Sequence, residues 1–246
     1  MRELERRRAI VLRLARMESA PSRAAAISTG FAPLNAALDT GGFPRGSILE
    51  IFGPSCGKTT LVLQSIARLQ AGGGAAGWID ADHTFDPQYA ASLGVDLARL
   101  PLARPDSAEQ ALEIARRLAA SGALDLLVVD SAAALTPQVE RETAIGDSGP
   151  GLHSRVLASG LRKLALAALR GGVSVVFLNQ IRARLEPAGE TSAGGAPLKL
   201  YAAVRIRVAP APGSRLRFRV LKNRAAEAFR EGELEWKPGR GFAETP

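Results

Sequence analysis

The sequence predicts an α/β fold in which a mostly parallel central sheet is flanked by helices, and two observations support this prediction. From residue 27 onward, short apolar segments alternate with segments of helical periodicity, the order typical of strand–helix–strand units. The apolar segments at 124–132 and 173–181 are almost continuous, as expected of parallel strands that are buried on both faces. Residues 201–223 alternate with period 2 instead, so a C-terminal β-hairpin extension is expected.

The same patterns place the individual elements. Strands are predicted at 46–53, 75–82, 124–132 and 173–181, and helices at 58–71, 107–122 and 153–172. The C-terminal hairpin turns at 209–214. Ser107 is expected to cap the second helix, because Gln110 follows at the spacing of a capping box, and Gly171 is expected to close the third helix.

Residues 1–26 are predicted to form a basic N-terminal helix and a linker. Apolar residues recur there at helical spacing, at Leu4, Val11, Leu14 and Met17. The stretch lacks the apolar core of a signal peptide, and it contains acidic residues that transit peptides avoid. Two interpretations stay open: the helix contacts an acidic neighbour or DNA, or it packs on its own domain.

Composition limits the class of protein. With 246 residues, 46% of them hydrophobic, the chain can bury a substantial core. The formal net charge of +8 favours an anionic partner, first of all nucleic acid, although a general enrichment in arginine would give the same number. The single cysteine excludes an intrachain disulfide and a multi-cysteine metal site, and it suits a reducing cytosol. No apolar run reaches about 18 residues, so we expect a cytoplasmic protein without a membrane span.

The stretch "IFGPSCGKTT" predicts a phosphate-binding loop, because a strand leads into a glycine loop and then into a helix. Lys58 is expected to reach the β- and γ-phosphates of ATP, and the hydroxyl of Thr59 is expected to bind Mg²⁺. Asp130 ends the apolar strand "LLVVD" and is expected to support the same metal ion. The predicted nucleotide contacts of the loop are Gly53, Pro54, Ser55, Cys56, Gly57, Lys58, Thr59 and Thr60.

The loop is one residue shorter than the usual pattern. Only Pro54, Ser55 and Cys56 separate Gly53 from Gly57, where four residues are typical. The missing peptide unit removes one N–H donor, and Pro54 has none of its own. Two outcomes stay open: a phosphate cradle of weaker affinity, or a loop that is closed to phosphate.

Six blocks of the sequence resemble, in order and spacing, the pattern of bacterial RecA recombinases. They are "STGFAPLNAALDTGGFPRGSILEIFGP", "IDADHTFDPQYAASLGVD", "LDLLVVDSAAALTPQ", "IGDSGPGL", "FLNQIR" and "LKNR". The resemblance extends from about residue 27 to about residue 242. It implies a RecA-like P-loop NTPase core over 27–246, and the C-terminal domain of the family is expected to be absent.

The resemblance also implies roles for single residues. Asp82 stands where the family has a glutamate that orients the attacking water, and its shorter side chain implies slow hydrolysis. Lys58 and Gln180 complete the implied catalytic set, with Gln180 sensing the γ-phosphate. Asp86 and Tyr89 match residues that contact adenine. Lys222 and Arg224 match two basic residues that reach the ATP of a neighbouring subunit, with arginine replacing lysine at the second position.

RecA-like proteins hold single-stranded DNA with two loops, which correspond here to residues 144–151 and 182–195. The second is expected to be a mobile segment; it is about three residues shorter than in RecA and has no aromatic side chain for base stacking. The alternative is that both segments are linkers without function. The expected DNA contacts are Arg155, Arg162, Arg182 and Arg184.

Two functions stay open. The first is an ATP-binding, single-stranded-DNA-associated RecA-like protein of DNA repair, recombination or the DNA-damage (SOS) response, with a slow DNA-dependent ATPase. The second is an adaptor of impaired catalysis that acts through RecA-type or polymerase-type partners, as the mutagenesis accessory proteins of the ImuA type do. The pairing strand of RecA subunits is not recognisable, and Leu200 replaces an interface aromatic, which argues against filaments.

Overall fold

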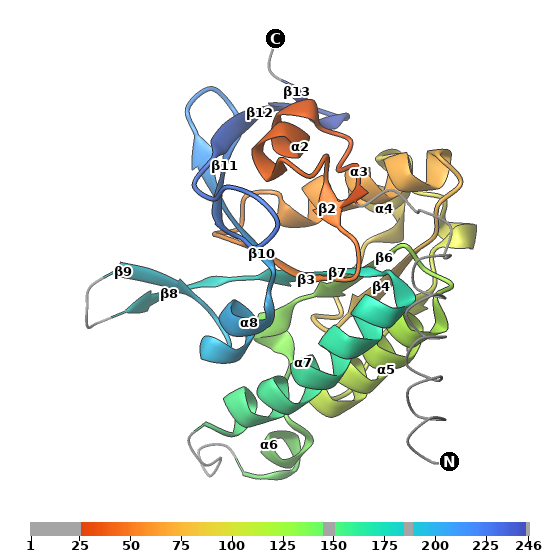
Figure 1. Ribbon diagram of the computed structural model, residues 1–246, viewed down its shortest axis with the longest axis vertical. Coiled ribbons are helices and arrows are strands. Elements are labelled where there is room, and N and C mark those ends of the chain that lie inside the picture. Colours follow the sequence, from red (N-terminus) through yellow and green to blue (C-terminus); the bar gives the residue numbers. More distant parts are fainter. Residues whose placement is uncertain (1–25, 145–150, 185–188, 245–246) are drawn as a thin grey trace, which may run out of the picture.

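The alternating apolar segments form one nine-stranded sheet in the order β13-β12-β11-β10-β3-β7-β6-β4-β5 (Figure 1). The computed structural model describes residues 26–144, 151–184 and 189–244. Six neighbouring strands of the sheet are parallel. They are β10 (Val204–Ala211), β3 (Ile48–Phe52), β7 (Ser174–Asn179), β6 (Leu126–Asp130), β4 (Ala76–Asp80) and β5 (Leu102–Ala103). The four predicted strands are among them, and β5 and β10 are added to the parallel part.

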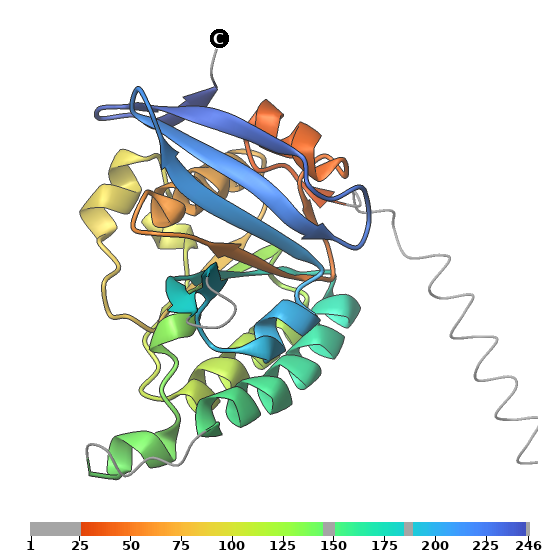
Figure 2. The same ribbon diagram turned by 90° about the vertical axis from the view of Figure 1, so that its left-hand side faces the viewer.

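The C-terminal extension is larger than the predicted hairpin. β10 joins the parallel part beside β3, and β11 (Arg215–Asn223), β12 (Glu231–Lys237) and β13 (Gly241–Glu244) follow it as antiparallel neighbours (Figure 2). β10 and β11 alternate between buried and more exposed residues, so their period was readable. β12 was not predicted, because Leu234 is the single fully buried residue of Glu231–Lys237 and the residues around it are mostly charged.

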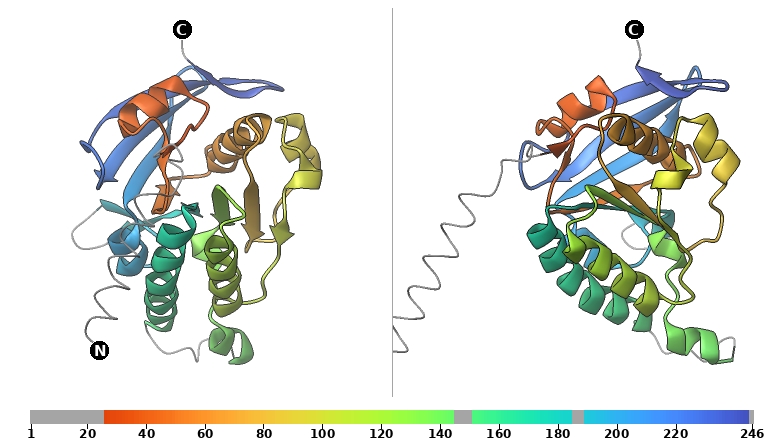
Figure 3. Two further views of the ribbon diagram at one scale, coloured as in Figure 1. Left: turned by 45° about the vertical axis from the view of Figure 1, so that its right-hand side comes forward. Right: turned by 90° about the vertical axis from the view of Figure 1, so that its right-hand side faces the viewer.

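Helices cover both faces of the parallel strands (Figure 3). On one face α3 (Lys58–Ala71) packs with α2 (Ala32–Leu38) and α4 (Pro87–Ser92). On the other face lie α5 (Ala108–Ser121), α7 (Leu152–Gly171) and α8 (Ala196–Tyr201). Each face has its own cluster of buried aliphatic side chains, which is why the strands are apolar at nearly every position.

The shorter elements complete the chain. They are β1 (Ala26–Ile27), β2 (Phe43–Pro44), the 3₁₀ helices Leu97–Arg99 and Ala132–Ala134, α6 (Gln138–Glu142), β8 (Ile181–Arg184) and β9 (Gly189–Ser192). None of the helices in the described ranges combines the length and the apolar character that crossing a membrane requires.

The predicted helix caps are confirmed in part. Ser107 Oγ accepts a hydrogen bond from the N–H of Gln110 at 3.2 Å, as expected of an N-cap. The amide oxygen of Gln110 accepts from the N–H of Asp106 at 2.5 Å instead of from Ser107, so the capping box is shifted by one residue. Gly171 is the last residue of α7, and the left-handed residue that follows the helix is Gly172, at φ 66.

The second predicted DNA loop is partly regular. Its ends form an antiparallel pair in which Arg182 faces Thr191 and Arg184 faces Gly189, so strands occupy part of the segment where only a loop was expected. We call β8 and β9 together the loop hairpin. Residues 185–188 at its tip lie outside the described residues, as do residues 145–150 of the first loop and the predicted N-terminal helix.

The C-terminal end of α7 packs tightly against α5. A Cβ atom added at Gly171 would lie 1.9 Å from the carbonyl oxygen of Ala119, whereas one at Gly172 would meet nothing within 4 Å. Gly171→Ala should therefore destabilise the fold by about 1–3 kcal/mol through overpacking. Gly172→Ala carries only the cost of its left-handed backbone, about 1 kcal/mol. Urea unfolding of both variants tests this order, and a smaller loss for Gly171→Ala would contradict it.

Candidate nucleotide and DNA sites

The phosphate loop starts where β3 ends and is held against the neighbouring strand β10. A Cβ atom at Gly53 would lie 2.1 Å from the carbonyl oxygen of Val208, so only glycine allows this approach. Among the described residues, none accepts a hydrogen bond from the backbone N–H groups of Ser55, Cys56 or Gly57. Three donors next to the N-terminus of α3 suit a phosphate group.

Lys58 is folded into this loop. Its ammonium group donates to the carbonyl oxygens of Gly53 at 2.9 Å and Pro54 at 2.6 Å. Burial lowers the pKa of the lysine, and the nearby Cys56 and Asp130 counteract this effect. The positive charge therefore lies inside the arc of the loop, where the sequence predicted it, but it is bound to carbonyl groups of the loop itself.

Thr59 and Asp130 are brought together as predicted for a magnesium site. The Thr59 hydroxyl donates to the Asp130 carboxylate at 3.1 Å, across from the first turn of α3 to the end of β6. Burial and the negative charge of Asp82 raise the pKa of Asp130 to about 6, and the Thr59 hydrogen bond opposes this rise. A hydroxyl and an acidic carboxylate at this spacing are hard oxygen ligands of the kind that Mg²⁺ prefers, so the residues fit the ion.

Asp82 lies in the turn after β4, close enough to Asp130 to raise its pKa. Its carboxylate accepts hydrogen bonds from the N–H and the hydroxyl of Ser131, at 3.1 and 3.0 Å. The turn itself is organised by the buried Asp80, which accepts from the N–H of Thr84 at 2.9 Å and pairs with Arg104 at 3.0 Å. The sequence prediction missed this role of Asp80, although a carboxylate that ends a buried strand is a recognisable signal.

The residues expected at adenine have structural partners. Asp86 caps α4 by accepting from the N–H groups of Gln88 and Tyr89, at 2.8 and 3.0 Å. The Tyr89 hydroxyl is hydrogen-bonded to the Thr60 hydroxyl at 2.7 Å, which joins α4 to the first turn of α3. Tyr89 is therefore placed beside the phosphate loop, whereas Asp86 is exposed and positions Tyr89.

A hollow of about 440 Å³ adjoins the same loop. Two aromatic rings, Trp236 of β12 and Phe242 of β13, contribute to its wall and contact each other edge to face, with centroids 5.3 Å apart. Cys56, Gly57 and Thr60 form the side next to the phosphate loop. The sequence prediction missed both aromatic residues, because they lie more than 170 positions beyond the loop and carry no local motif.

Gln180 lies next to the start of the phosphate loop, because the N–H of Gly53 donates to the carbonyl oxygen of the preceding residue, Asn179, at 3.4 Å. Lys222 and Arg224 have their contacts elsewhere in the chain. Gln180 is exposed at the end of β7. Lys222 donates to the carbonyl oxygens of Lys199 at 2.7 Å and Leu200 at 3.2 Å, and Arg224 donates to Leu200 at 2.7 Å. The two cations thus bind the C-terminal end of α8, and their expected contact with a neighbouring subunit stays a prediction.

The arginines expected at DNA lie on two elements, α7 and β8. Arg155 and Arg162 are exposed on α7, on the side away from the buried Leu157 and Leu161. Arg182 is exposed on β8; the side chain of Arg184 lies outside the described part of the structure. The segment that follows β9 adjoins α7, because a Cβ atom at Gly195 would lie 2.7 Å from the Ser154 hydroxyl.

Comparison with known proteins agrees with this architecture. Residues 3–243 match the RecA N-terminal domain. Proteins named RecA from Frankia alni and Rhizobium leguminosarum bv. trifolii are 45% and 46% identical over 231 and 232 residues. The matches cover 89% of this chain and 67% and 64% of those proteins. The chain thus spans about two thirds of the length of these relatives.

Among solved structures, the RadB recombinase superimposes with a TM-score of 0.72 and 22% identity, over 89% of this chain and the whole of that one. This likeness concerns the fold. With a family match from residue 3 to residue 243 and relatives that are 45–46% identical, the chain belongs to the RecA family.

Proposed function

We propose that the protein binds ATP with Mg²⁺ and single-stranded DNA, and that it hydrolyses ATP slowly in DNA repair or recombination. One observation supports this proposal above the others. The N–H groups of Ser55, Cys56 and Gly57 have no acceptor among the described residues, and they lie beside Lys58 and the Thr59–Asp130 pair. A shortened loop that had closed on itself would have used these donors internally.

The roles of the residues follow from their positions. Lys58 exchanges its two carbonyl partners for phosphate oxygens when ATP enters the loop. Thr59 and Asp130 hold Mg²⁺, which supplies positive charge to the phosphate oxygens when it is bound. Asp82 orients the attacking water and must share its carboxylate with Ser131, so only part of its hydrogen-bonding capacity is available.

The base of the nucleotide has two candidate aromatic contacts near the loop, Tyr89 and the Trp236–Phe242 pair. Tyr89 is hydrogen-bonded to Thr60 on one side of the loop, and Trp236 and Phe242 line the hollow on another. Flat apolar walls next to a phosphate site suit a nucleobase, which stacks on aromatic rings. These residues supply affinity that the shortened phosphate loop lacks.

Single-stranded DNA is the proposed second ligand. The chain has a net charge of +8, and Arg155 and Arg162 are exposed on α7 and Arg182 on β8. Exposed arginine side chains can bind backbone phosphates without reading the base sequence. The proteins named RecA that resemble this chain support a role in DNA recombination and repair.

The adaptor is the second candidate function, and one observation favours it. The ammonium of Lys58 is bound by the carbonyl oxygens of Gly53 and Pro54, and the carboxylate of Asp82 is bound by Ser131, so both catalytic groups are occupied by the protein. An ATPase rate that rises when single-stranded DNA is added supports the motor function. A rate that stays flat supports the adaptor.

The test of nucleotide binding uses a fluorescent ATP analogue with Mg²⁺ and the variant Lys58→Ala. We expect wild type to bind the analogue with micromolar affinity. In Lys58→Ala this affinity should fall by roughly 100-fold or more, because a charge-assisted contact to phosphate is lost. Lys163→Ala is the matched control, since this lysine is exposed on α7 and lies on another element. Equal affinities of wild type and Lys58→Ala would refute the proposed site.

The length of the side chain at position 82 should limit hydrolysis. Asp82→Glu extends the carboxylate by one methylene toward the attacking water and should raise kcat by roughly 10- to 100-fold. Asp82→Asn should abolish the reaction, because the amide cannot accept a proton from water. Single-turnover hydrolysis measures both. A glutamate variant no faster than wild type would show that the distance at this position is not limiting.

Asp130 should make the magnesium-free protein sensitive to pH. Its pKa in the fold is raised to about 6 from an ordinary 3.8, so the protonated carboxyl stabilises the fold at low pH. This stability is lost as pH rises from about 4 through about 6, and the difference corresponds to on the order of 3 kcal/mol. Asp130→Asn should therefore be more stable than wild type at about pH 8 and similar to it at about pH 4.

Urea unfolding in the presence of a chelator measures this difference. Added Mg²⁺ and ATP should act in the opposite direction, since the metal requires the ionised carboxylate and stabilises wild type more above pH 6 than below it. A stability gap between Asp130→Asn and wild type that is the same at both pH values would contradict the assignment of this pKa.

A further inference from the structure

An ion pair with a fully buried carboxylate lies in the middle of the sheet, outside the nucleotide site. Glu50 is fully buried in β3, and Arg205 lies directly opposite it on the parallel strand β10. The guanidinium donates to the Glu50 carboxylate at 2.6 Å and lies over the ring of Phe52, 4.6 Å from its centroid. Asn179 of β7 donates to the other carboxylate oxygen at 2.8 Å.

Burying a charge pair at this place lowers the stability of the fold, because both groups lose their hydration. The other residues of β3 are apolar, and aliphatic residues at both positions would avoid the loss of hydration. A buried pair is retained most readily where it fixes one arrangement of the groups around it. The residues that the pair contacts therefore indicate its purpose.

Those contacts lead to the loop hairpin. Arg205 donates a second hydrogen bond to the hydroxyl of Ser192, the last residue of β9, at 3.1 Å. The side chain of Asn179 donates to the carbonyl oxygen of Ala193 at 2.9 Å and accepts from the N–H of Gln180 at 2.9 Å. Both ends of the hairpin are thus fastened to the ion pair, one through Ser192 and one through Gln180.

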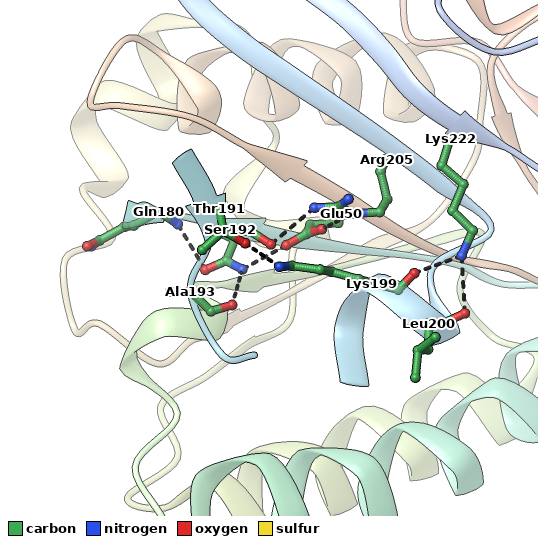
Figure 4. A network of polar contacts seen from close by, with 10 residues as sticks. Glu50, Gln180, Thr191, Ser192, Ala193, Lys199, Leu200, Arg205 and Lys222 are labelled. Carbon is green, nitrogen blue, oxygen red and sulfur yellow. Dashed lines mark hydrogen bonds and ion pairs between the residues drawn. The ribbon is translucent and has the colours of Figure 1, made fainter. Parts of the chain in front are cut away.

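The same hairpin is joined to α8 and the two C-terminal cations. The ammonium of Lys199 in α8 is hydrogen-bonded to the hydroxyl of Thr191 in β9. Lys222 binds the carbonyl oxygens of Lys199 and Leu200 at the end of this helix. Figure 4 shows these contacts as a continuous series from Lys222 to Gln180.

We propose that Glu50 and Arg205 are positioning residues that hold the loop hairpin in one register relative to Gln180 and α8. Neither side chain lines the phosphate loop, because they face the side of the sheet on which α8 packs. They act on DNA through the hairpin, and this part of the inference rests on the proposed function. The positioning itself concerns the free chain and can be tested without any ligand.

The first experiment measures amide hydrogen exchange in the free protein. The double variant Glu50→Leu/Arg205→Met removes both charges and leaves no buried ion unpaired. Residues 189–193 should exchange roughly tenfold faster than in wild type, while β6 and β7 keep their protection. The matched control, Glu233→Leu/Arg217→Met, removes an ion pair of 2.8 Å between β12 and β11, far from the hairpin, and should leave residues 189–193 unchanged.

Two milder variants keep the test decisive if the double variant does not fold. Ser192→Ala cuts only the bond between the pair and β9, and Arg205→Lys keeps the charge but loses the fork that binds Glu50 and Ser192 together. Both should accelerate exchange at residues 189–193 by roughly threefold. Wild-type exchange in folded variants overturns the positioning role.

The second experiment compares affinity for a fluorescent oligothymidine with and without the ATP analogue. In wild type the ATP analogue should change the affinity for oligothymidine by roughly tenfold, which measures the coupling between the two sites. In Ser192→Ala the affinities with and without the analogue should be nearly equal, while the affinity for the analogue itself stays as in wild type. A wild-type ratio in that variant overturns the coupling. If wild type binds neither the ATP analogue nor oligothymidine, the proposed function is refuted instead. The hydrogen-exchange experiment then still tests whether Glu50 and Arg205 position the loop hairpin.

Discussion

The register of the parallel strands is the constraint on which the candidate site depends. Asp80 of β4 is aligned with Asp130 of β6, and Phe52 of β3 is aligned with Asn179 of β7. Because parallel strands end at the same edge, the residues that follow them form one row across the sheet. The phosphate loop, the turn with Asp82 and the start of the loop hairpin all belong to this row. A shift of one residue in any of these strands would turn its polar group to the other face.

Two acidic residues in this sheet, Glu50 and Asp130, differ in how far nearby groups compensate their negative charge. Glu50 has a guanidinium and an amide as partners, so its charge is compensated within the protein. Asp130 has a hydroxyl as its hydrogen-bond donor and another carboxylate nearby, and its pKa rises accordingly. A compensated charge stabilises an arrangement, whereas a poorly compensated one is suited to bind a cation from outside. This difference separates the structural acid from the candidate metal ligand.

The charged residues of the candidate site have partners within the free chain. Lys58 binds carbonyl oxygens of its own loop, Asp82 binds Ser131, and Lys222 and Arg224 bind the end of α8. Each contact satisfies a charged group that would otherwise lack a partner, and each has to change if that group is to reach a ligand. Ligand binding would therefore be linked to rearrangements in the loop, the β4 turn and α8.

The sequence by itself determined the α/β class, four strands of the parallel core and the three long helices beside them, and it predicted the phosphate loop and the meeting of Thr59 with Asp130. These features depend on local periodicity and on motifs whose residues are close in the chain or end successive strands. Only the tertiary structure decided that Trp236 and Phe242 lie beside the phosphate loop, that Arg205 is the partner of Glu50, and that the second loop is fastened as a hairpin. These contacts join residues that are many positions apart, and their side chains meet because the order of the strands brings β10, β12 and β13 to the same side of β3. Strand order depends on how whole faces pack together, and no local pattern in the chain encodes it.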